Sequence, residues 1–101
     1  MNSNFVETMK TDRTFAEVFS PGELIMEELE ERGWTQKDFA AILNRPLRFV
    51  NEIIKGKRGI TPKIANELGA AFGTSAQFWI NLESMYRLAQ GRSRDVNKEA
   101  I

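Results

Sequence analysis

The stretch TQKDFAAILNRPLRFVNEIIKG, residues 35–56, decides the fold of this chain. Apolar residues recur at helical spacing in both of its halves: Phe39, Ala40 and Leu43, then Val50, Ile53 and Ile54. Between the halves stands Asn44-Arg45-Pro46. Asn tolerates the left-handed backbone that ends a helix, and Pro suits the first position of the next helix. The pattern predicts a helix-turn-helix, whose second helix can lie in the major groove of DNA.

Start and stop signals divide the rest of the chain into further helices. Three pairs of residues have the spacing of an N-terminal capping box: Ser20 with Glu23, Thr35 with Asp38, and Thr74 with Gln77. Thr61-Pro62 opens another helix, and Gly91 is the expected stop of the last one. We therefore expect an all-α fold of five helices, over residues 21–32, 36–43, 46–55, 62–72 and 75–90.

The last predicted helix carries an apolar stripe made of Phe78, Trp79, Leu82, Met85, Tyr86 and Ala89. Its aromatic rings could form a stacking platform for single-stranded nucleic acid, but their helical spacing favours a place in the core. Ile80 and Leu88 lie off this stripe. They are either ordinary exposed apolar residues or part of a contact between subunits.

Three segments follow from these patterns. Residues 1–19 have weak periodicity and read as an N-terminal arm that either docks on the core or is disordered. Residues 20–91 contain the predicted helices and form the folded domain. Residues 92–101 are a polar C-terminal tail, too short to build a core of its own.

Composition excludes several kinds of site. The chain of 101 residues has neither Cys nor His, which removes disulfides, thiolate metal sites, the usual general base and the most common metal ligand. We therefore expect no enzyme, no metal and no cofactor. With 42% hydrophobic residues the chain can bury one core. It lacks a bilayer-length apolar run and a signal-peptide pattern, so we expect a cytoplasmic protein that does not bind membranes.

A net charge of zero conceals a strong separation of charge along the chain. Residues 22–34 carry five acidic residues and one basic residue, a net charge of −4. Residues 35–63 carry seven basic and two acidic residues, a net charge of +5. Because the positive segment coincides with the helix-turn-helix, we favour phosphate binding over chance clustering on a solvated face.

The acidic residues Glu27, Glu28, Glu30 and Glu31 stand close together in the first predicted helix. Such a group could suggest paired catalytic carboxylates or a metal site. No neighbouring residue completes a ligand set, so we interpret the group as a charged, solvated helix face.

An ordered set of short motifs runs through residues 20–90: Ser20-Pro21-Gly22-Glu23-Leu24, Gln36, Ala40, Asn51-Glu52-Ile53-Ile54, Gly56-Lys57-Arg58, Ile60-Thr61-Pro62 and Phe78-Trp79-Ile80-Asn81-Leu82. In these motifs the chain resembles the HigA/VapI type of XRE (Cro/C1-type) helix-turn-helix regulators. The resemblance implies a five-helix, lambda-repressor-like DNA-binding domain with the second and third helices as the helix-turn-helix. It also implies an antitoxin that neutralises an mRNA-cleaving, RelE-like toxin and represses its own operon. Asn44 replaces the Gly that many helix-turn-helix proteins have at this turn.

The second helix of the motif supplies the candidate base contacts, because its opposite face must meet the core. These candidates are Leu47, Arg48, Asn51 and Glu52. Arg can bond guanine through two hydrogen bonds and Asn can do the same with adenine, while Leu can touch the thymine methyl group. Glu52 can either accept from a cytosine amine or orient Arg48 four residues earlier.

Phosphate contacts are expected around this helix, from Gln36, Lys37, Arg45, Lys55, Lys57 and Arg58. Backbone N–H groups near Gly56 and Gly59 favour phosphate in the same place. We expect a homodimer on double-stranded DNA with a two-fold operator. A regulator without a toxin partner and a protein-interaction module with the same fold are the alternatives.

Overall fold

The computed structural model describes the backbone of residues 20–100 and the side chains of residues 20–91. Its helices are α3 (Pro21–Arg32), α4 (Gln36–Leu43), α5 (Leu47–Ile54), α6 (Pro62–Phe72) and α7 (Ala76–Ala100). These five helices account for all the regular structure within residues 20–100, which confirms the expected all-α fold. The arm predicted over residues 1–19 lies outside the described residues.

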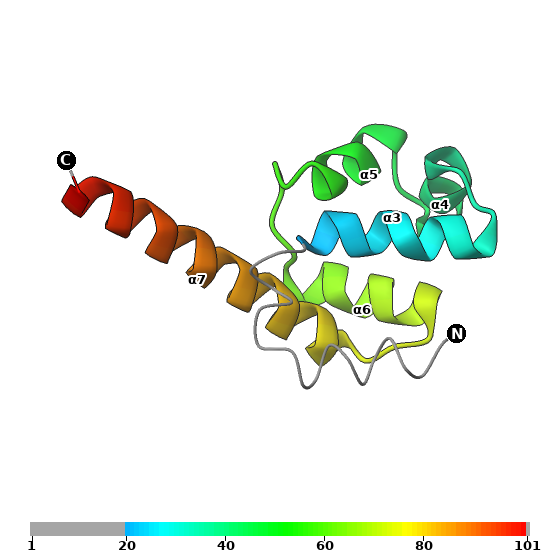
Figure 1. Cartoon of the computed structure of the whole chain (residues 1–101). Helices are drawn as coiled ribbons and strands as arrows, with labels where there is room; N and C mark the ends of the chain where they lie inside the picture. Colours follow the sequence, from blue (N-terminus) through cyan, green and yellow to red (C-terminus); the bar gives the residue numbers. More distant parts are fainter. Residues whose placement is uncertain (1–19, 101) are drawn as a thin grey trace.

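The helices form one bundle from which α7 extends. Helix α5 packs against α3 and α4, α6 packs against α4 and α7, and α7 also contacts α3. Figure 1 shows the C-terminal part of α7 leaving the bundle as a long rod. None of the described helices combines the length and the apolar composition that a bilayer crossing requires.

Local signals set the starts of α3 and α4 as expected. The Ser20 hydroxyl accepts from the Glu23 N–H at 3.2 Å, and the Glu23 carboxylate accepts from the Ser20 N–H at 2.8 Å. Thr35 and Asp38 form the same reciprocal pair before α4. Both capping boxes are therefore confirmed, and they close the first turns of the two helices that precede α5.

The N-terminus of α3 holds the C-terminus of α5 through a close backbone approach. A Cβ atom added to Gly22 would stand 1.9 Å from the carbonyl oxygen of Ile54. Only glycine leaves room for this approach, and both Pro21 and Gly22 are buried. The position of α5 on the bundle therefore depends on a residue 25 positions before its first turn.

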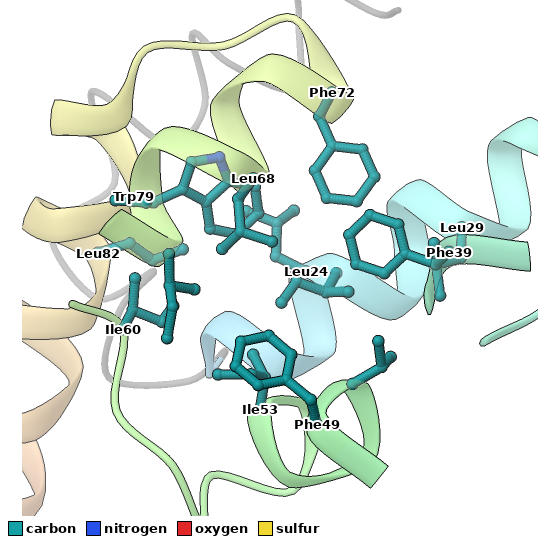
Figure 2. Packing of buried hydrophobic residues seen from close by; sticks show 14 of the residues in the cluster. Leu24, Leu29, Phe39, Phe49, Ile53, Ile60, Leu68, Phe72, Trp79 and Leu82 are labelled. Atoms are coloured by element: carbon teal, nitrogen blue, oxygen red, sulfur yellow. The ribbon is translucent and has the colours of Figure 1, made fainter. Parts of the chain in front are cut away.

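Aromatic rings and aliphatic side chains pack together in the core of the bundle (Figure 2). The ring centroids of Phe39 and Phe72 are 5.0 Å apart, and those of Phe72 and Trp79 are 5.8 Å apart. Trp79 is 1% exposed, and its indole N–H donates to the Thr74 hydroxyl at 2.7 Å. Phe78 packs edge-on against Trp79. These contacts confirm that Trp79 belongs to the core and show that the half-buried Phe78 packs against it.

The two ends of α7 differ from the prediction. Ser75, not Thr74, caps the helix, because its hydroxyl accepts from the Phe78 N–H while the Thr74 hydroxyl is engaged by Trp79. The stop predicted at Gly91 is also wrong, since the helix continues to Ala100. Glycine ends a helix only where it adopts the left-handed conformation, and inside a helix it costs only about 1 kcal/mol.

The apolar stripe predicted along α7 is correct only in part. Leu82 and Ala89 are buried, whereas Met85 is 47% exposed. Conversely, Ile80 packs against the core, although it was placed off the stripe. Leu88 is 61% exposed, as expected. The prediction assumed a core along one straight face, but the other helices cover α7 unevenly.

Candidate nucleic-acid interface

The turn between α4 and α5 is built as the sequence predicted. Asn44 has φ 57° and ψ 47°, the left-handed conformation that ends α4. The Arg45 N–H then donates to the carbonyl of Ala40 at 2.9 Å, and Ala40 itself is buried. One detail is corrected: Pro46 caps α5 with an extended ψ of 150° and is not its first helical residue. The helix begins at Leu47, and the Phe49 N–H donates to the Pro46 carbonyl at 3.0 Å in its first turn.

Helix α5 has an inner and an outer side. Phe49, Val50 and Ile53 on the inner side are 7%, 1% and 5% exposed. On the outer side, Leu47 is 44% exposed and the Arg48 side chain 87% exposed. The outward orientation predicted for Leu47 and Arg48 is confirmed, and the described part of the chain leaves this face uncovered. Contacts between these residues and bases remain predictions.

Glu52 and Asn51 lie beside Arg48 on the outer side and are half-buried. One oxygen of the Glu52 carboxylate accepts from Arg48 Nε at 3.2 Å, and the other accepts from Arg58 Nε and Nη2 at 3.1 and 2.8 Å. The hydrogen bond from Arg58 contributes most to a lowered pKa of Glu52, against an opposing effect of burial. The amide of Asn51 donates weakly to the Leu47 carbonyl at 3.4 Å. Glu52 therefore holds two guanidinium groups.

The loop after α5 carries the other candidate cations. Lys55, Lys57 and Arg58 are exposed, and the N–H groups of Lys57 and Arg58 fold back onto the Glu52 carbonyl at 2.9 and 3.3 Å. This fold brings the loop next to the outer side of α5. The residues predicted to contact bases and the loop residues predicted to contact phosphates thus lie on one surface.

At the start of α4, the two candidate residues differ. Lys37 is exposed, while Gln36 is half-buried with its amide nitrogen 3.6 Å from the sulfur of Met26. A sulfur acceptor is weak, so Gln36 can exchange this contact for a phosphate oxygen at little cost.

Arg45 is held differently from the other candidate cations. Its Nε and Nη2 atoms donate to the two carboxylate oxygens of Glu67 at 3.1 and 2.6 Å, and its guanidinium lies 4.5 Å from the Phe49 ring centroid. The bond to Glu67 raises the pKa of Arg45, and the same bond lowers the pKa of Glu67. A phosphate contact by Arg45, which remains a prediction, must compete with this two-bond ion pair.

The acidic face of α3 needs one correction. Glu28 is 6% exposed and forms an ion pair with Arg32, so it is not solvated as predicted. Arg32 also donates to the Phe72 carbonyl at 3.1 Å, which fixes the pair against the core. Glu27, Glu30 and Glu31 are exposed, as expected. Among the described side chains, residues 20–91, no group of acidic side chains could hold a metal ion.

Three residues with tertiary roles near this surface had no sequence signal. Glu67 pairs with Arg45, as described above. Glu83 of α7 accepts from the Ile60 N–H at 3.1 Å, and Arg87 of α7 donates to the Gly56 carbonyl at 3.2 Å. The partners lie 22 to 31 residues apart in the chain, beyond the reach of helical periodicity.

The chain is similar to known proteins in sequence and in fold. Residues 25–79 match the helix-turn-helix family model HTH_3. The chain is 30% identical over 79 residues to the uncharacterized HTH-type transcriptional regulator YddM of Escherichia coli K12, covering 77% of this chain and 84% of that protein. It is 34% identical over 80 residues to virulence-associated protein I of Dichelobacter nodosus, covering 76% and 74%. The structure of Pseudomonas aeruginosa antitoxin HigA with the higBA promoter matches with a TM-score of 0.72 and 37% identity, covering 79% of this chain and 88% of that one.

Proposed function

The chain belongs to the helix-turn-helix family, and from this premise we propose that it is a DNA-binding antitoxin repressor of the HigA type. The single observation that carries the proposal is the outer side of α5, where Arg48 stands 87% exposed on a helix whose inner side is buried. A helix with this division can enter the major groove without disturbing the core.

Recognition of bases is assigned to the outer side of α5. Arg48 can pair with guanine and Asn51 with adenine, and Leu47 can contact a thymine methyl group. Glu52 either accepts from a cytosine amine or acts through Arg48, and its two guanidinium partners favour the second role.

Binding of phosphates is assigned to residues that border this helix: Gln36, Lys37, Arg45, Lys55, Lys57 and Arg58. The exposed cations among them, Lys37, Lys55, Lys57 and Arg58, would hold the DNA backbone and fix the register of α5 in the groove. They add affinity and salt dependence without adding sequence preference.

We propose further that a homodimer binds a two-fold operator, with half-sites about 10 bp apart or a multiple of that spacing. The partner in the cytoplasm would be a RelE-like toxin. Similarity to the uncharacterized HTH-type transcriptional regulator YddM supports a role in transcription regulation, and a regulator without a toxin is the alternative. In either case the chain acts by binding and not as an enzyme.

Two experiments test this function. Fluorescence anisotropy with the DNA upstream of the gene should show tighter binding than a scrambled duplex of equal length. Equal affinity for the two duplexes at every salt concentration would contradict sequence-specific binding. Co-expression with the adjacent gene should copurify a small basic protein if the chain is an antitoxin, and its absence favours the free-standing regulator.

A further inference from the structure

The loop between α5 and α6 is weakly held by apolar contacts. Residues 55–59 are all exposed, and only Ile60 at the end of the loop is buried. A cavity of about 100 Å³, lined by residues of α3, α5, α7 and the loop, lies beneath it. Hydrogen bonds must therefore supply most of the order of this segment.

Helix α7 supplies two such bonds. The Glu83 carboxylate, whose side chain is 15% exposed, accepts from the Ile60 N–H at 3.1 Å and also from Arg87 Nε at 3.3 Å. Arg87 then extends to the Gly56 carbonyl at 3.2 Å. A Cβ atom on Gly59 would stand 3.2 Å from the Glu83 carboxylate, so the loop approaches this side chain closely. The pair thus fastens the loop at both ends.

We infer that Glu83 and Arg87 are positioning residues for DNA binding, although neither belongs to the helix-turn-helix. The inference rests on the proposed function, in which Lys57 and Arg58 of this loop bind phosphates. A loop that is ordered before binding loses less conformational entropy in the complex, and this raises affinity. Because phosphates carry no sequence information, the effect should be equal for all duplexes.

Whether a substitution of Glu83 raises or lowers DNA affinity distinguishes a positioning role from simple charge repulsion between Glu83 and DNA. Removal of a negative charge near DNA should by itself raise affinity. We expect Glu83→Ala to lower affinity about five-fold for operator and scrambled duplex alike, the equivalent of about one net hydrogen bond. Glu83→Gln keeps an acceptor for the Ile60 N–H and should bind at least as tightly as the wild type. Glu27→Ala, on an exposed acidic residue of α3, is the control for loss of one negative charge and should not lower affinity.

A mutant cycle tests whether the effect acts through the loop. In a Lys57→Ala/Arg58→Ala background, Glu83→Ala should change affinity less than about two-fold, because the positioned groups are already absent. Arg87→Lys keeps its charge but loses the fork that reaches both Glu83 and Gly56, so it should weaken binding in the same direction as Glu83→Ala. Thermal unfolding of each variant provides an independent measure of the fold.

Two results would overturn the inference while leaving the proposed function intact. In the first, the wild-type protein binds its operator and Glu83→Ala binds it equally well. In the second, Glu83→Ala lowers DNA affinity as much in the Lys57→Ala/Arg58→Ala background as in the wild type. A wild-type protein that binds no duplex at low salt would overturn the proposed function itself. Both the inference and the proposed function are supported if the wild type binds its operator specifically and Glu83→Ala lowers affinity only when Lys57 and Arg58 are present.

Discussion

The two sides of the eight-residue helix α5 differ in burial and in their proposed roles. The inner side places Phe49, Val50 and Ile53 in the core that Figure 2 shows, and each is less than 8% exposed. The outer side leaves Arg48 in solvent and ties Glu52 to two guanidinium groups. Burial of an aliphatic side chain is worth about 1.5–3 kcal/mol, whereas an exposed ion pair is worth about 0–1 kcal/mol. Stability and DNA recognition should therefore be separable by mutation.

The largest expected effect is on the inner side. Ile53→Ala should lower the free energy of unfolding by about 2–4 kcal/mol, because it removes buried methylene groups and leaves a cavity. Urea denaturation followed by circular dichroism measures the change. At a temperature where this variant remains folded, its operator affinity should stay within about two-fold of the wild type. A large loss of operator affinity in the folded variant would contradict the separation of stability from DNA recognition.

On the outer side the reverse should hold. Arg48→Ala and Asn51→Ala should each weaken operator binding by about 1–3 kcal/mol, because each removes a hydrogen-bonding partner of a base. Thermal unfolding of Arg48→Ala should match that of the wild type, since the Arg48 side chain is 87% exposed. Asn51→Ala should change it little, because the Asn51 amide donates only weakly, to the Leu47 carbonyl of its own helix. Fluorescence anisotropy with the operator and with a scrambled duplex measures the preference for the operator sequence. If Arg48→Ala leaves that preference untouched, the outer side of α5 does not read sequence.

The loop next to the outer side should give a smaller and less specific effect. Lys57→Ala should lower affinity for all duplexes evenly and reduce the slope of log affinity against log salt by about one unit. Titrations at several potassium chloride concentrations measure this slope. Lys63→Ala, on an exposed residue of α6, is a matched control and should change it less. A loss restricted to the operator would instead assign Lys57 to base contact.

The smallest effect concerns the acid limit of stability. The pKa of Glu67 is lowered from its ordinary 4.5 by Arg45, so the pair stabilises the fold above that value. This stabilisation is lost as the pH falls below 4.5 and through the lowered pKa of the folded chain. Glu67→Gln should therefore be less stable at pH 7 and flatten the loss of stability below pH 4.5. Glu30→Gln, on an exposed residue, should reproduce the wild-type curve.

Local chemistry made most of α5 and its turn predictable. The left-handed Asn44, the capping box of Thr35 and Asp38, and the burial of Val50 all depend on residues within four positions of one another. Such relations are visible in the sequence because a helix repeats every 3.6 residues. For the same reason, the candidate residues of the outer side could be named by excluding the inner ones.

Tertiary partners could not be predicted in this way. The sequence marks Arg45 only as a cation near the motif, and its pairing with Glu67 depends on how α6 packs. Glu83 and Arg87 reach the loop only because α7 passes beneath it. The end of α7 differs from the prediction because Gly91 permits a helix to stop without requiring it. Sequence-based prediction and structure differ wherever the position or partner of a residue depends on residues distant in the chain.

Guanine N7 faces the major groove, so methylation protection by dimethyl sulfate tests the central claim most directly. The wild-type protein should protect guanines in two patches of its operator, about 10 bp apart or a multiple of that. Arg48→Ala at saturating concentration should restore methylation at one guanine in each patch and leave the rest protected. An unchanged pattern in Arg48→Ala, or the absence of protected guanines with the wild type, would contradict the placement of α5 in the groove.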